Sequence, residues 1–179
     1  MFEIHYWQML LLITVLWIVY RVIANKKSGN FSIAEELRML PVYICLIVIA
    51  RIVYFPMQTV DGQTDTLRFD ASETFPPKFN VVPIAHMFDT RENWRVNLIA
   101  NIFLFIPVGM IWPSCFEKLD TVGKTILCGF CMSLFIELTQ LLFYERYSDV
   151  DDLIMNTIGT AIGAIIYLGL KKISRRKRG

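Results

Sequence analysis

The chain has 179 residues, of which 55% are apolar and 13% aromatic, and its mean hydropathy is +0.47. A soluble domain of this length has no core large enough to bury so much apolar surface, whereas a lipid bilayer accepts it. The net charge of +2 is too small to indicate a nucleic-acid partner, and the basic residues stand at the edges of apolar runs. The composition therefore predicts an integral membrane protein that does not bind nucleic acid.

Five apolar runs are long enough to cross about 30 Å of hydrocarbon as helices, the third only just. In chain order they occupy residues 4–24, 37–55, 97–113, 125–144 and 153–170. The first run resembles a signal peptide in length, but Glu3 precedes it, basic residues follow it and no small-residue cleavage pattern closes it. The predicted fold is all-α, a polytopic bundle of about five transmembrane helices that forms a single domain over residues 1–179.

A more polar segment, residues 56–95, separates the second and third runs. Within it, Asp61-Gly62 lies between residues 57–60 and 66–69 and predicts a small hairpin. The segment is too short and too polar to form a core of its own, so we expect it to cap the outer face of the bundle. A basic tail, residues 171–179, follows the last run.

The distribution of Lys and Arg predicts the orientation, because segments rich in these residues tend to stay in the cytoplasm. With five helices and a cytoplasmic C-terminus, twelve basic residues fall inside: Arg21, Lys26, Lys27, Arg38, Lys118, Lys124, Lys171, Lys172, Arg175, Arg176, Lys177 and Arg178. Five then fall outside: Arg68, Lys78, Arg91, Arg95 and Arg146. We therefore expect an outside N-terminus and a cytoplasmic C-terminus, with the tail attracted to anionic lipid headgroups.

Polar side chains at membrane depth are costly, and they usually face a partner or a wet cavity. Helical spacing places such residues on one face of each of the last three predicted helices. They are Asn97 and Asn101 on the third, Ser133, Glu137, Gln140 and Tyr144 on the fourth, and Asp149, Asp152 and Asn156 at the start of the fifth. Glu137, Gln140 and the starts of the third and fifth helices all lie toward the outside. We therefore expect an outward-facing polar pocket, with Arg146 beside it.

Small residues and prolines suit close packing of the same helices. Gly159 and Gly163 let the last helix approach a neighbour closely, and Pro107 with Gly109 can bend the third helix. Arg51 lies near the outer end of the second helix. Its side chain either pairs with Glu137 or Asp152 or extends to the outer headgroups.

Three stretches together resemble the VanZ-like family. They are Asn97-Leu-Ile-Ala-Asn101-Ile-Phe-Leu-Phe-Ile-Pro107-Val-Gly109, Phe135-Ile-Glu137-Leu-Thr-Gln140, and the set Arg146, Asp149, Asp152, Asn156, Gly159 and Gly163 with its spacing. Asn80-Val-Val-Pro83-Ile is similar to the segment that precedes the first block in that family. The resemblance implies a multi-pass protein of the bacterial cytoplasmic membrane. The family is named for a member linked to low-level teicoplanin resistance, and the resemblance implies no reaction.

Three functions remain open for the predicted pocket. It could bind an exported lipid headgroup, such as that of a polyprenyl-linked cell-wall precursor, with Arg146 contacting phosphate and the carboxylates accepting from hydroxyls or amines. It could instead serve a membrane enzyme that acts on a lipid-linked or phospholipid substrate with the same carboxylates. The polar stripes could also be structural bonds between helices. No cofactor is evident, although Glu137, Asp149 and Asp152 could hold a divalent cation.

Overall fold

The computed structural model describes residues 2–29, 31–55, 66–69, 79–80, 94–143 and 148–177. Five helices in this part of the chain, of 19 to 27 residues, are long and apolar enough to cross a membrane. The predicted all-α membrane bundle is thereby confirmed. The chain divides into two compact units, Met1–Ala71 and Ser72–Gly179, and each is described separately below.

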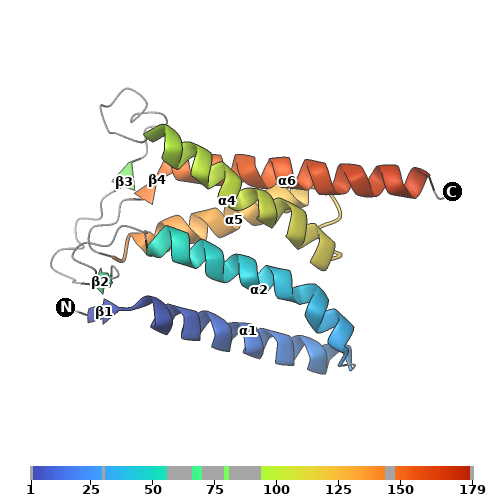
Figure 1. The fold of residues 1–179 in the computed structure, drawn as a ribbon, viewed down its shortest axis with the longest axis horizontal. Coiled ribbons are helices and arrows are strands. Elements are labelled where there is room, and N and C mark those ends of the chain that lie inside the picture. The colour runs from blue at the N-terminus through green and yellow to red at the C-terminus, as the bar shows by residue number, and fades with distance from the viewer. Residues whose placement is uncertain are drawn as a thin grey trace. The chain divides into compact units, whose positions relative to one another are not determined.

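The first unit contains two antiparallel helices, α1 (Tyr6–Ser28) and α2 (Ile33–Tyr54) (Figure 1). At the start of α1 the backbone N–H of His5 donates to Gln8 Oε1 at 2.8 Å, which satisfies a donor that the helix leaves open. The helix ends at Gly29, whose φ of 72° is a left-handed conformation that glycine adopts without steric cost. Helix α2 begins four residues later, at Ile33.

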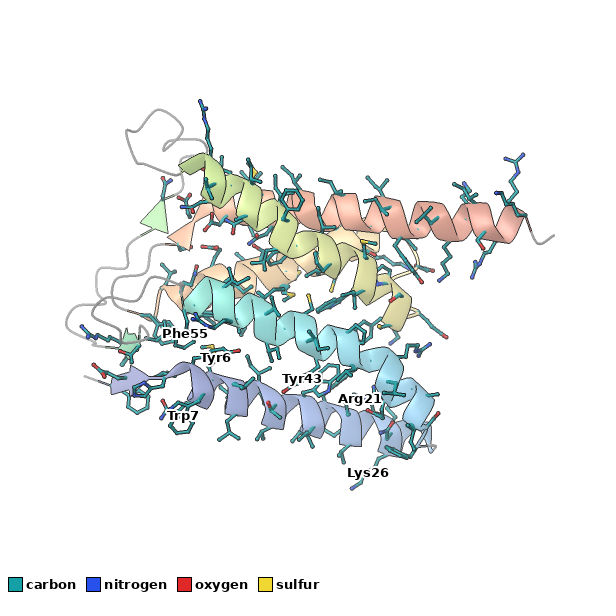
Figure 2. All side chains as sticks on the ribbon, viewed as in Figure 1. Tyr6, Trp7, Arg21, Lys26, Tyr43 and Phe55 are labelled. Atoms are coloured by element: carbon teal, nitrogen blue, oxygen red, sulfur yellow. The ribbon has the colours of Figure 1, made fainter. Side chains whose placement is uncertain are left out.

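One face of α1 contacts α2. Arg21, which is only 7% exposed, donates through Nε and Nη2 to both carboxylate oxygens of Glu36 at 2.9 and 2.8 Å. Thr14 and Tyr43 share a hydrogen bond of 2.8 Å between their hydroxyls. Figure 2 shows Arg21 on the side of α1 that faces α2, and Lys26 on the opposite side. The polar bonds between these helices are therefore on their facing sides.

A short sheet closes the other end of this unit. Strand β1 (Phe2–Ile4) pairs antiparallel with β2 (Leu67–Phe69), and Arg68 forms an ion pair of 3.3 Å with Glu3. The hairpin predicted around Asp61-Gly62 required residues 66–69 to pair with residues 57–60. Residues 57–65 lie outside the described residues, so the hairpin stays a prediction; the described arm, β2, pairs with the N-terminal strand.

The second unit contains α4 (Trp94–Cys115), α5 (Val122–Gln140) and α6 (Val150–Arg176). Helices α4 and α6 run in the same direction and α5 runs opposite to both (Figure 1). Helix α4 is continuous through Pro107. Strand β3 (Phe79–Asn80) pairs in parallel with β4 (Ser148–Asp149), which immediately precedes α6. The start of α4, the end of α5 and the start of α6 thus lie at one end of this unit.

Glycines let the backbones of α4 and α6 approach closely. A Cβ atom on Gly163 would lie 2.9 Å from the Cα of Gly109 and 3.0 Å from the backbone N of Met110. A Cβ atom on Gly159 would lie 3.0 Å from the carbonyl carbon of Ile102. These separations are shorter than ordinary van der Waals contact, so only glycine fits at either position without moving a helix. This contact fixes the register in which the polar residues of α4 and α6 meet.

Candidate functional site

The first link in the polar end of the second unit joins α4 to α6. Asn101, in the second turn of α4, donates through Nδ2 to Asp152 Oδ1 at 2.5 Å. Asp152 is in the first turn of α6. The two residues meet because α4 and α6 are parallel and start at the same end. Each lies one turn or more before a glycine of the close contact between these helices.

The second link joins α5 to the start of α6. Glu137 is 4% exposed, and its Oε2 accepts from the backbone N–H of Asp149 at 2.9 Å. Asp149 is also the N-cap of α6, since its Oδ1 accepts from the backbone N–H of Asp151 at 3.0 Å. Asn80 in β3 donates to the same Oδ1 at 3.2 Å. Asp149 therefore connects β3, α5 and α6.

A third link lies one turn deeper between α5 and α6. Asn156 is 3% exposed and donates through Nδ2 to the hydroxyl oxygen of Ser133 at 2.9 Å. Its Oδ1 is buried and has no hydrogen-bond partner among the described residues. A further turn along, the hydroxyl of Thr160 donates to the backbone oxygen of Asn156 and packs where a Cβ atom of Gly129 would stand. The polar contacts thus extend from the helix ends into the span.

Of the residues predicted to form the pocket, the structure brings six into this set of contacts: Asn101, Ser133, Glu137, Asp149, Asp152 and Asn156. Gln140, in the last turn of α5, is buried at 8% exposure, whereas Asn97 is exposed on the first turn of α4. Tyr144 and Arg146 lie outside the described residues. Whether these side chains line a pocket stays a prediction.

Arg51 belongs to the first unit, where its guanidinium lies 5.4 Å from the centre of the Tyr6 ring and donates to the backbone oxygen of Phe55. The Tyr6 and Phe55 rings themselves meet edge to face at 5.5 Å, and Figure 2 shows them at the same end of the α1–α2 pair. These contacts hold the Arg51 side chain at the end of α2. Its pairing with Glu137 or Asp152 stays a prediction.

Sequence reasoning missed two contacts among these polar residues. The amide of Asn80 was not expected to reach Asp149, although both fall in stretches that resemble one family. Gly129 was not singled out, although it lies four residues before Ser133 and so on the same helical face. Among the described residues, no group of three or more His, Cys, Asp or Glu side chains is arranged to hold a metal ion. The divalent cation at Glu137, Asp149 and Asp152 stays a prediction.

Five apolar helices, with carboxyl and amide groups bonded to one another within the spans, define a multi-pass membrane protein. The sequence profile of the VanZ/LLP1 family matches residues 42–172, which is most of the chain. The chain therefore belongs to the VanZ/LLP1 family. It is also 30% identical, over 91 residues, to Protein VanZ of Enterococcus faecium. That match covers 50% of this chain and 55% of the relative, so it spans about half the length of each. No solved structure matches the chain.

Proposed function

We propose that the polar cluster of α4, α5 and α6, formed by Asn101, Glu137, Asp149, Asp152 and Asn156, binds the headgroup of an envelope lipid or of a lipid-linked cell-wall precursor. The observation that carries the proposal is the convergence of Glu137, Asp152 and Asn156 from two helices at one end of their spans. Ionisable groups within membrane spans usually mark a pathway or a binding site for a substrate or ion. A cluster near the end of the spans suits a ligand whose tail stays in the bilayer.

From the charge distribution of the sequence we expect this end to lie on the outer face of the bacterial cytoplasmic membrane. In this position the cluster meets lipids and precursors after their export. Carboxyl oxygens would accept from hydroxyls or amines of the headgroup, and Arg146 would contact phosphate. If the ligand is a precursor that a glycopeptide also recognises, its capture would change susceptibility to teicoplanin-type antibiotics. The similarity to Protein VanZ supports this expectation.

Native mass spectrometry of the detergent-extracted protein tests the proposal. The wild type is compared with Glu137→Gln and Asp152→Asn, which keep the size of each side chain and remove one carboxylate. The matched control is Asp120→Asn, because Asp120 is an exposed carboxylate at the opposite end of the unit, bonded to Lys124 at 2.7 Å. We expect a co-purified lipid on the wild type and the control and its loss from both cluster variants.

The other outcomes separate the remaining functions. If the lipid is absent from the wild type but added phospholipid or lipid-linked precursor is converted to product, and Glu137→Gln abolishes that conversion, the cluster belongs to an enzyme. If neither binding nor conversion occurs and both variants lose the folded protein, the hydrogen bonds are structural. A wild-type adduct that persists in both folded variants would refute the assignment of the cluster as the site.

A further inference from the structure

We infer that the headgroup is recognised through a primary ammonium group, an inference that rests on the proposed function of the same cluster. The first step is an inventory of hydrogen-bonding groups. Asp152 accepts a bond from the amide of Asn101, and Glu137 accepts bonds from the backbone N–H of Asp149 and from the side chain of Ser148. All of these donors are neutral. Within the described residues, neither Glu137 nor Asp152 forms an ion pair.

The second step is the unmet acceptor at Asn156. Its Oδ1 is buried at 3% residue exposure and lacks a donor in the described part of the chain, while Nδ2 is engaged by Ser133. A buried carbonyl oxygen without a donor is costly, and more so at membrane depth, where water is scarce. Asn156 lies one turn, or about 6 Å, beyond Asp152 on the same face of α6. A ligand that reaches Asp152 can therefore supply the missing donor to Asn156.

The third step compares ligand chemistries. An ammonium group carries a positive charge and three N–H donors and no acceptor, which complements two carboxyl groups and an amide oxygen. A phosphate group offers acceptors only and would place its charge beside Glu137 and Asp152. A quaternary ammonium has no N–H donor and is usually held against aromatic faces, whereas the polar groups that converge here are oxygen acceptors.

Two kinds of envelope molecule carry such a group: an aminolipid such as phosphatidylethanolamine, and a lipid-linked peptide precursor with a free side-chain amine. Both present the same chemistry to the cluster. The expected position of the ammonium is between α5 and α6, within reach of Asp152, Glu137 and Asn156. The rest of the headgroup would remain toward the membrane surface.

The test titrates the full chain in detergent with defined lipids and measures the adducts by native mass spectrometry. Phosphatidylethanolamine, its N,N-dimethyl form and phosphatidylcholine keep the phosphate and the positive charge while the N–H donors fall from three to one to none. We expect affinity to fall along this series, by at least about tenfold from end to end, as for loss of a charged hydrogen bond. A second pair, a polyprenyl-linked muropeptide with a free lysine amine and its N-acetylated form, identifies the source of the amine.

Substitutions in the cluster test whether its residues cause the preference for an ammonium group. Asn156→Leu removes the unmet oxygen and keeps the branched shape of the side chain, and Asp152→Asn removes a carboxylate. We expect each to weaken binding of the amine lipid about tenfold and to leave phosphatidylcholine unaffected. The matched control is Thr157→Val, because among the described residues the Thr157 hydroxyl donates only to the backbone oxygen of Leu153 in its own helix. Helical circular dichroism and size-exclusion profiles establish that each variant is folded.

The outcomes distinguish failure of the ammonium inference from failure of the proposed headgroup binding. A lipid bound through Glu137 with equal affinity along the methylation series, or with a preference for phosphatidylglycerol, would overturn the ammonium inference and leave headgroup binding intact. Binding that a chelator abolishes would also overturn it, because a metal ion would then occupy the cluster. If no lipid or precursor binds in a Glu137-dependent way, both the ammonium inference and the proposed headgroup binding are refuted. Preference for the free amine of either source supports the inference.

Discussion

The close contact between α4 and α6 predicts a large difference between two glycine-to-alanine substitutions in the same helix. In Gly163→Ala the new Cβ atom would lie 2.9 Å from the Cα of Gly109, where ordinary contact begins at 3.4 Å. The two helices must therefore separate by at least 3.4 − 2.9, or about 0.5 Å, at this point, and by more at the carbonyl oxygen of Ile106. Overpacking of this kind typically costs about 1–3 kcal/mol.

Gly169→Ala is the matched control, because a Cβ atom at Gly169 meets nothing within 4 Å. That substitution removes a flexible glycine from α6 and should be neutral or stabilising by up to about 1 kcal/mol. The assay is thermal unfolding of the two purified variants and the wild type in one detergent, followed by circular dichroism. We expect Gly163→Ala to unfold at a lower temperature and Gly169→Ala at the same or a higher one. Equal behaviour of the two variants would refute the packing argument.

Three further predictions concern the rest of the chain. Arg21→Met and Glu36→Leu should each lower the free energy of unfolding, on the order of 2 kcal/mol, and the double variant should lose less than their sum, as a double-mutant cycle would show. A C-terminal fluorescent-protein fusion should fluoresce in the cytoplasm and a periplasmic phosphatase fused there should be inactive; the reverse pattern would contradict the proposed orientation. The hydrogen bond from Lys124 lowers the pKa of Asp120, so its contribution to stability is present at neutral pH and lost as pH falls through that lowered value. Lys124→Gln should return the pKa of Asp120 to its ordinary range, measured by carboxyl carbon chemical shifts.

The five helices were predictable because a span must be apolar over its whole length, so local composition identifies it. Their ends were less predictable. Helix α6 continues to Arg176, whereas the apolar run ends at residue 170, because polar residues also continue a helix once it leaves the hydrocarbon. The pairing of Phe2–Ile4 with Leu67–Phe69 could not be foreseen, since two short strands far apart in sequence carry no mutual signal.

The candidate site, too, was predictable only in part. Helical spacing placed Glu137 and Asn156 on polar faces, but spacing alone does not identify which faces meet. Asn97 and Asn101 share a face by their spacing, yet only Asn101 is bonded to α6. The reason is the register set by the glycine contact: α6 begins at Val150, so Asn97, one turn earlier on α4, lies before the start of the partner helix.

The length of α6 has a mechanical consequence. Its 27 residues extend about 40 Å, which exceeds a hydrocarbon thickness of about 30 Å, and its last turns carry Lys171 and Arg176. The polar ends lie beyond the hydrocarbon, so only the apolar run, residues 153–170, must match it; its 18 residues extend about 27 Å, and a bilayer with a thinner hydrocarbon layer is accommodated by tilting. Since the backbones of α4 and α6 are in contact at Gly109 and Gly163, the two helices must tilt together. Bilayer thickness would then reorient the Asn101–Asp152 pair relative to the membrane surface without separating its two side chains.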